Sequence, residues 1–179
     1  CGASTRSPHN HARPRSSLTN QSFRVVCIAL VVTMLVSIAR AEPFTTSASL
    51  KSAVDRCLDV EPSGENCCSR ETGAANCGLA GTTDMPDWDV SQVTNMDNLF
   101  NEKSSFNQDI SRWDTSSVTS MRNMFNSASS FTASDLADWN VGKVTDMYRM
   151  FGGRWDWRPF NLSLSRWDVG EVTTMGNMF

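Results

Sequence analysis

The chain has 179 residues, with 16 basic and 19 acidic side chains and a formal charge of −3. Residues 1–41 hold five arginines, both histidines and no acidic side chain, so 11 basic and 19 acidic groups remain in residues 42–179. This acidic body would repel a phosphate backbone, which argues against nucleic acid as a partner. It also lacks histidine, which excludes Ser-His-Asp and Cys-His catalytic sites and zinc held by histidine.

The first segment, residues 1–41, has the order of a secretory signal peptide. Arginines precede fifteen uncharged residues at 25–39. Ala39 and Ala41 then flank Arg40 in an A-x-A cleavage motif. A helix of fifteen residues spans about 22 Å, less than the roughly 30 Å of a bilayer core. We therefore expect a secreted or cell-surface protein, cleaved between Ala41 and Glu42. The alternative is a retained single-pass signal anchor, because the basic part is long for a signal peptide.

Residues 42–84 are expected to form a small N-terminal cap. Leu50, Val54, Cys57 and Leu58 recur at the spacing of one helix face, and Pro62 follows as a helix breaker. Four cysteines lie within 21 residues of an exported chain, which predicts two disulfides among Cys57, Cys67, Cys68 and Cys77. A bond between the adjacent Cys67 and Cys68 would be strained, which leaves two pairings open. A metal site is the alternative, but no C-x-x-C pair and no histidine supports it.

Residues 85–179 consist of repeats. A thirteen-residue segment occurs four times, as WDVSQVTNMDNLF at 88–100, WDTSSVTSMRNMF at 113–125, WNVGKVTDMYRMF at 139–151 and WDVGEVTTMGNMF at 167–179. The units start at Trp88, Trp113, Trp139 and Trp167, at spacings of 25, 26 and 28 residues. Periods in the twenties are typical of solenoids with one unit per turn. The fourth unit stops at its phenylalanine, so we expect further coils and a terminal cap beyond it.

Each unit carries two sets of apolar residues. Val93, Met96, Leu99 and Phe100 have the spacing of a short helix, and a threonine near its start can cap it. A second apolar pair precedes the next tryptophan, and a short strand is expected at 108–113 and its equivalents. The predicted fold is an α/β solenoid of leucine-rich-repeat-like coils, each with one short strand and one short helix. Methionine and tryptophan recur once or twice per unit, which favours core columns over a redox stripe or a sugar platform.

One segment departs from the repeats. Residues 152–158 lengthen the third unit, and extra residues in one repeat are expected in a loop on one face. Four side chains of this segment are therefore candidates for ligand contact, namely Arg154, Trp155, Trp157 and Arg158. The alternative is that both tryptophans pack locally. Asn161 begins an N-glycosylation sequon, which matters only in a eukaryotic secretory pathway.

An acidic column follows the tryptophans at Asp89, Asp114, Asn140 and Asp168. Paired carboxylates can hydrolyse polysaccharides as general acid and base. A residue type that recurs in nearly every unit is more typical of a hydrogen-bonding ladder that satisfies turn backbone. The sequence therefore predicts no catalytic residue, no metal ligand and no cofactor.

The unit WDVSQVTNMDNLFNEKSSFNQDISRW at 88–113 resembles the repeat of the BspA-like leucine-rich-repeat surface proteins, over residues 85–179. The segment around Cys57 and Cys67-Cys68 also looks like the cysteine-bearing segment that precedes such repeats in some eukaryotic, protist-type members. The resemblance implies an exported solenoid that acts in adhesion or recognition, and it brings no catalytic residue.

Three functions follow as hypotheses. The first is a non-enzymatic secreted or surface module that binds extracellular proteins or glycans. The second is an architectural spacer or wall component without a specific ligand, and the third is an aspartate-dependent polysaccharide hydrolase. Membrane attachment is expected only through an uncleaved N-terminal segment or a C-terminal anchor beyond Phe179.

Overall fold

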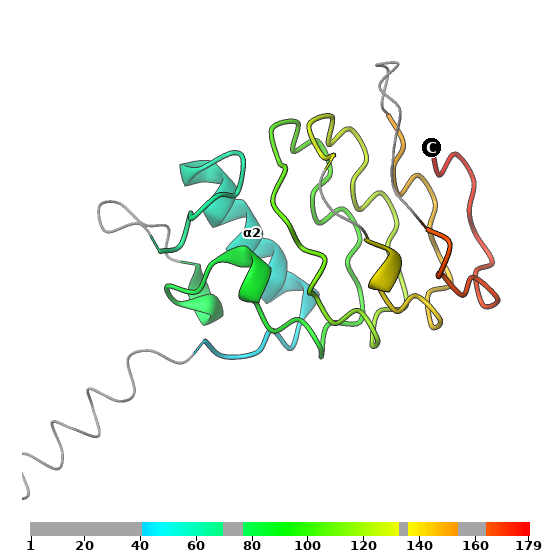
Figure 1. Cartoon of the computed structure of the whole chain (residues 1–179), viewed down its shortest axis with the longest axis horizontal. Coiled ribbons are helices and arrows are strands. Elements are labelled where there is room, and N and C mark those ends of the chain that lie inside the picture. The colour runs from blue at the N-terminus through cyan, green and yellow to red at the C-terminus, as the bar shows by residue number, and fades with distance from the viewer. Residues whose placement is uncertain (1–40, 70–76, 133–135, 154–163) are drawn as a thin grey trace, which may run out of the picture. The chain divides into compact units, whose positions relative to one another are not determined.

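The computed structural model describes residues 41–69, 77–132, 136–153 and 164–179 (Figure 1). The chain divides into two compact units, Cys1–Ile38 and Ala39–Phe179, and all described residues belong to the second. The expected signal peptide therefore lies outside the described residues, except for its last position. Within the described ranges, no helix is both long and apolar enough to cross a bilayer.

The cap contains one α-helix, α2, which runs from Ser47 to Val60. Thr46 begins it, because its side chain accepts a hydrogen bond from the Ser49 N–H at 3.1 Å. The helix ends before Pro62, with the Glu61 N–H donating to the Cys57 carbonyl. Its buried face consists of Leu50, Ala53, Val54, Cys57 and Leu58, which include all four residues whose spacing indicated a helix.

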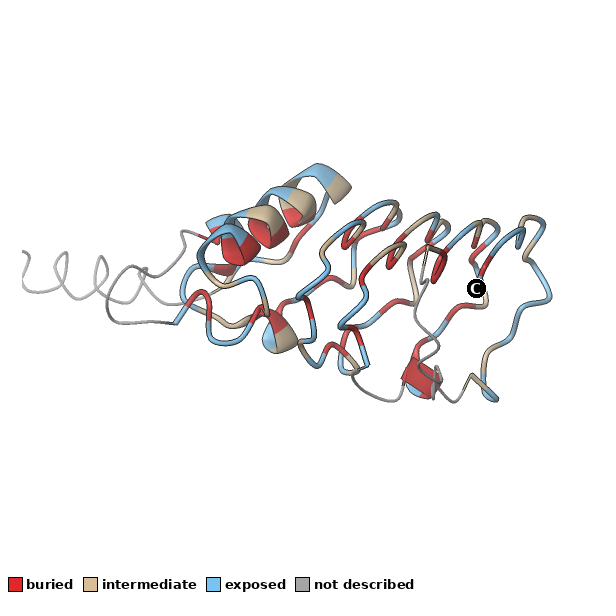
Figure 2. Cartoon of the chain, turned by 90° about the horizontal axis from the view of Figure 1, so that it is seen from above, coloured by how far each residue is buried: buried red, intermediate tan, exposed pale blue. Residues whose placement is uncertain are grey.

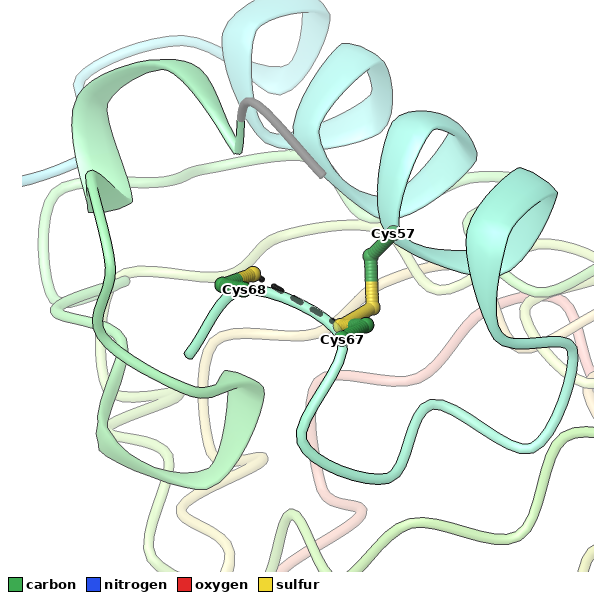
Figure 3. A group of neighbouring side chains, drawn as sticks. All are labelled: Cys57, Cys67 and Cys68. Carbon is green, nitrogen blue, oxygen red and sulfur yellow. Dashed lines mark hydrogen bonds between the residues drawn. A yellow bond between two sulfur atoms is a disulfide. The ribbon is translucent and has the colours of Figure 1, made fainter. Parts of the chain in front are cut away.

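Two disulfides hold the chain that follows α2. Cys57 is bonded to Cys67 and Cys68 to Cys77, which is one of the two pairings that the sequence left open. Figure 3 shows the first bond reaching down from α2, with Cys68 beside it. All four cysteines are buried, and the Sγ atoms of Cys67 and Cys68 lie 3.6 Å apart. The turn that carries both cysteines is therefore fastened to α2 on one side and to the 3-10 helix η1, Gly78–Ala80, on the other.

The four repeat units lie side by side and are joined in register. Isolated parallel bridges connect Asn95 to Ser120, Ser120 to Asp146 and Asp146 to Thr174. Around the first bridge, alternate N–H groups of one unit donate to the next unit at 2.8–2.9 Å, from Met96, Asn98, Phe100 and Glu102 to Ser120, Arg122, Met124 and Asn126. The same pattern joins the second unit to the third and the third to the fourth. Equivalent residues are therefore neighbours in space, in columns that run across the units (Figure 1).

The secondary structure differs from the expected strand and short helix in each coil. Residues 93–100 and their equivalents are successive turns around the bridge, and residues 108–113 form no strand. The described ranges contain α2, η1 and two further 3-10 helices, η2 at Met85–Asp87 and η3 at Leu136–Asp138. The physical reason lies in the backbone hydrogen bonds, since alternate N–H groups, such as those of Met96 and Asn98, donate to the neighbouring unit, and the Leu99 N–H between them donates to the Met96 carbonyl three residues earlier.

Aromatic columns fill the space inside the units. The rings of Phe100, Phe125, Phe151 and Phe179 stack at centroid distances of 5.4, 5.5 and 5.8 Å. Methionines occupy the adjacent inward positions, and all of them in the described ranges are buried except Met175, which is 43% exposed. Figure 2 shows buried residues along the inner sides of the coils and exposed residues at their outer turns.

The tryptophans connect each unit to the residues before it. The indole N–H of Trp113 donates to the Met85 carbonyl at 2.8 Å, and that of Trp139 to the Ile110 carbonyl at 3.1 Å. Trp167 makes the equivalent bond to the Leu136 carbonyl, whereas Trp88 donates to the Thr83 carbonyl only five residues earlier. Because a buried indole N–H needs an acceptor, this bond fixes the direction of each ring.

The cap covers the edge of the first unit. The Ser47 hydroxyl donates to the Asn95 carbonyl, and the Asn107 N–H donates to the Ser63 carbonyl. Lys103 of the first unit pairs with Asp55 of α2 at 2.9 Å. The apolar edge that the first unit would otherwise expose is therefore packed against the cap.

Candidate ligand-contact surface

The turn after each inward methionine presents two side chains on the outside of the unit. We call these eight positions the turn face: Asp97, Arg122, Tyr148 and Gly176 in the first column, and Asn98, Asn123, Arg149 and Asn177 in the second. Each of the eight is partly or fully exposed. The backbone bonds between units hold these columns in register, so side chains far apart in the sequence become neighbours.

The second column sits on a left-handed backbone. The φ angles of Asn98, Asn123, Arg149 and Asn177 are 58°, 52°, 53° and 53°. Asparagine tolerates this conformation better than most residues other than glycine, which explains its choice in three units. The Asn123 side-chain amide also donates to the Asn98 side-chain oxygen at 3.1 Å. Arg149 is the exception in this column.

The first column holds Tyr148, the single tyrosine of the chain. The Arg122 guanidinium lies over its ring, with Cζ 4.3 Å from the centroid, and the Arg149 Cζ lies 5.9 Å away. A Cβ on Gly176 would come within 3.3 Å of the ring carbon Cδ2, so the ring lies against the backbone of the fourth unit. The Asn177 amide donates to the phenol oxygen at 3.5 Å. The second and third units therefore bring together one aromatic ring and two guanidinium groups.

The two arginines of this cluster differ in whether they form an ion pair. Arg122 pairs with Asp146, at 3.4 Å between Nη1 and Oδ2. Asp97 accepts hydrogen bonds from the Ser120 hydroxyl and from the Arg122 N–H. Arg149 takes part in none of the ion pairs found between described residues, and it is exposed. Arg122 is also exposed, so the two guanidinium groups differ in pairing: Arg149 has no ion-pair partner among the described residues.

The aspartate column is used for turn bonding. Asp89 accepts from the N–H and hydroxyl of Ser91, and Asp168 accepts from the Gly170 N–H at 3.0 Å. Hydrogen bonds from the hydroxyl and the backbone of Ser116 hold the pKa of Asp114 below its ordinary value. Asp89, Asp114 and Asp168 therefore each accept hydrogen bonds within their own turn.

A hollow of about 260 Å³ lies between the third and fourth units. Its charged lining consists of Asp138, Arg166 and Asp168. Arg166 forms an ion pair with Asp138, and Asp168 is engaged in its own turn. The charged groups that line the hollow are therefore engaged in an ion pair and a turn hydrogen bond.

The remaining predicted site residues fall into two groups. The candidate contact residues Arg154, Trp155, Trp157 and Arg158, and the sequon residue Asn161, lie outside the described residues. The four cysteines are engaged in disulfides. Cys57, Cys67 and Cys68 have sulfur atoms within 4.8 Å of one another, which is the one metal-like grouping among described side chains. A disulfide sulfur is not a thiolate, so the bonded form offers no thiolate ligand.

At the proposed cleavage position, the Glu42 N–H donates to the Leu79 carbonyl at 2.8 Å, and Phe44 is buried two residues later. Among the described residues, contacts with the rest of the chain are thus present from Glu42 onward.

The cluster at Tyr148 was missed in the sequence. Two signals for it were present: a tyrosine found once in the chain, and arginine at a position where the other units have asparagine. Both become visible only when the units are aligned and each column is inspected for its exception.

Residues 73–179 match a family described as "Mycoplasma protein of unknown function, DUF285". None of the curated proteins and none of the solved structures compared with the chain matches it.

Proposed function

Because this chain belongs to the DUF285 family, whose description names no function, we propose a function from its structure and its repeats. The protein is a non-enzymatic binding module of the BspA-like surface type. Its units form a solenoid that is capped at one end by α2 and the two disulfides. The turn face contacts extracellular proteins or glycans.

One observation carries this proposal. The backbone ladder keeps the turn face in register, and the third unit places Tyr148 beside Arg149, which stands where the other three units have asparagine. Exposed aromatic and arginine side chains are the types enriched at recognition surfaces. A contact surface on a rigid repeat scaffold accounts for this pair better than packing does, because the other units are built without it.

The location outside the cell rests on two features. The cap is stapled by two disulfides, which form and persist in oxidising compartments. The segment before it has the sequence of a signal peptide. Secretion or display on the cell surface is consistent with both.

A spacer without a ligand is the second candidate. It is favoured by the threonine column, in which the hydroxyls of Thr119, Thr145 and Thr173 donate to the threonine carbonyl of the preceding unit. These exposed groups are used to join the units, as a purely architectural protein requires. The two candidates differ in whether the turn face has a ligand.

The test is binding of the labelled full chain to an array of glycans and extracellular matrix proteins. The binding module is expected to retain a defined set of ligands. The matched control is Thr119→Val with Thr145→Val, which alters the threonine column and should leave that set unchanged. Silence over the whole array, with a folded chain, would overturn the binding module in favour of the spacer.

A further inference from the structure

We infer that Arg149, supported by Tyr148 and Arg122, binds the carboxylate of a sparsely charged acidic glycan. This inference rests on the proposed binding function and names the ligand class for the turn face. Four features lead to it: the backbone conformation of Arg149, its lack of an ion-pair partner among described residues, the polarity of the turn face, and the net charge of residues 42–179.

The backbone at Arg149 is the first feature. Its φ of 53° places a long side chain in a conformation that L-residues other than asparagine and aspartate adopt at a cost. The other three units avoid this cost with asparagine, and two of these asparagines bond to each other. A residue kept in an unfavourable conformation at the surface is typical of a functional position.

Charge is the second feature. Arg122 is turned toward Asp146 and the face of Tyr148, so its charge is partly satisfied within the protein. Arg149 lies beside the same ring and is exposed. A guanidinium recognises a carboxylate through two parallel N–H bonds, and the neighbouring ring limits the directions that Arg149 can take. The arrangement suits one carboxylate.

The polarity of the surface distinguishes a glycan from a protein partner. Among described residues, the large apolar side chains with high exposure are Val60, Leu79, Val169, Met175 and Phe179, and none belongs to the turn face. The centre of a protein interface is depleted of charged residues, whereas the turn face has one aromatic ring surrounded by charged and amide side chains. The turn face offers amides from Asn98, Asn123 and Asn177, which suit the hydroxyl groups of a sugar.

The net negative charge of residues 42–179 favours a ligand that itself carries few negative charges. Residues 42–179 carry 19 acidic and 11 basic groups, and Asp97 and Asp146 lie on the same side as Arg149. A densely sulfated polymer would meet these carboxylates at once, at a cost in repulsion. A glycan with isolated carboxylates brings one charge to Arg149 and hydroxyl groups to the rest.

The experiment measures binding of the full chain by calorimetry in two arms. One arm uses a hyaluronan hexasaccharide, whose carboxylates are uronates, and the other uses sialyllactose, whose carboxylate is a sialate. Each has a neutral partner, the carboxyl-reduced hexasaccharide or lactose, and heparin is the densely sulfated comparison. We expect at least one carboxylated ligand to bind about tenfold tighter than its neutral partner, as a charge-assisted hydrogen bond supplies.

The variants assign the effect to Arg149. Arg149→Asn introduces the residue that the other three units have at this position and should remove the tenfold preference, while Arg149→Lys keeps part of it. Arg112→Asn removes the same charge elsewhere, where Arg112 pairs with Asp87, and should change nothing. Thermal unfolding of each variant verifies that lost binding is not lost folding.

Three results would overturn the inference: equal binding of neutral and carboxylated ligands, tighter binding of heparin than of both, or unchanged binding in Arg149→Asn. Absence of binding to every glycan would overturn it too. In that case the array of glycans and matrix proteins decides separately whether a protein ligand remains, so the binding module can survive the failure of the glycan site.

Discussion

Arg149 occupies a position whose backbone suits asparagine, and its φ of 53° equals that of Asn177 in the next unit. The same backbone in four units with one exception allows a comparison inside a single molecule. An exposed residue outside a core column contributes little by burial, so the conformational cost is the main effect of the arginine on folding.

We therefore predict that Arg149→Asn raises the free energy of unfolding by about 1 kcal/mol. Urea unfolding at neutral pH measures this change. The reciprocal variant Asn123→Arg, at the same column position, should lower stability by a similar amount. A loss of stability in Arg149→Asn would mean that the contact with Tyr148 outweighs the backbone cost.

The indole of Trp113 supports a second prediction at this scale. Its N–H donates to the Met85 carbonyl inside the core, so Trp113→Phe leaves a buried carbonyl without this donor and is expected to cost about 1–3 kcal/mol or more, since the ring is also smaller. Trp167→Phe is the control, because its bond to Leu136 is only partly buried and water can replace it. Equal losses in both variants would contradict this account.

At the scale of elements, α2 is joined to the first repeat unit by Asp55. Its carboxylate contacts Lys51 one turn earlier in the helix, at 2.6 Å, and Lys103 of the repeat at 2.9 Å. Burial by itself raises the pKa of Asp55, but the hydrogen bonds and charges of the two lysines outweigh it, so the pKa lies below its ordinary value of 3.8. Folding therefore favours the ionised form of the Asp55 carboxyl group.

A carboxyl group whose pKa is lowered by folding stabilises the protein above its unfolded value and loses that contribution as the pH falls. Asp55→Asn should thus lower the unfolding temperature at neutral pH and have progressively less effect as the pH falls below about 3.8. Asp59→Asn on the same helix is the control. A constant difference between wild type and Asp55→Asn down to strongly acidic pH would contradict the ion-pair explanation.

Over the whole described body, from Glu42 to Phe179, the ladder and the phenylalanine column make each unit depend on its neighbours. Phe125 stacks on Phe100 and Phe151 and contacts Phe131, so it links three units. Repeat proteins of this kind gain stability from nearest-neighbour interfaces. A defect in a middle unit removes two interfaces at once.

Phe125→Ala should cost about 3–5 kcal/mol, as expected for a fully buried phenylalanine. Phe179→Ala should cost much less, since that side chain is 71% exposed. Chemical unfolding followed by tryptophan fluorescence and by circular dichroism measures both. Similar losses for the two variants would show that the column does not couple the units.

The sequence predicted the parts of the fold that depend on side-chain burial. Leu50, Val54, Cys57 and Leu58 indicated a helix that α2 contains. The residues assigned to inward columns are buried in the first three units, whereas in the fourth Met175 and Phe179 are exposed. The destinations of the backbone hydrogen bonds were not predictable in this way. Apolar residues such as Val93 and Met96 have the same spacing in a short helix and in a turn paired with its neighbour.

The candidate site was less predictable than the core. Tyr148 and Arg149 looked like ordinary surface residues within a repeat, and their importance depends on Arg122, which is 26 residues before Tyr148 and adjacent in space. Contacts between units at a distance of one repeat cannot be read from local spacing. The sequence pointed instead to the longer segment at 152–158, and its contact residues Arg154, Trp155, Trp157 and Arg158 remain predictions.

The constant length of the segment from tryptophan to phenylalanine has a consequence for how such proteins diverge. That segment has thirteen residues in every unit, whereas the interval from phenylalanine to the next tryptophan differs between units. The bridges at Asn95, Ser120, Asp146 and Thr174 stay in register all the same. Insertions and deletions are thus tolerated in one interval and forbidden in the other. Evolution, or an engineer grafting a peptide, has a single place per unit in which length is free.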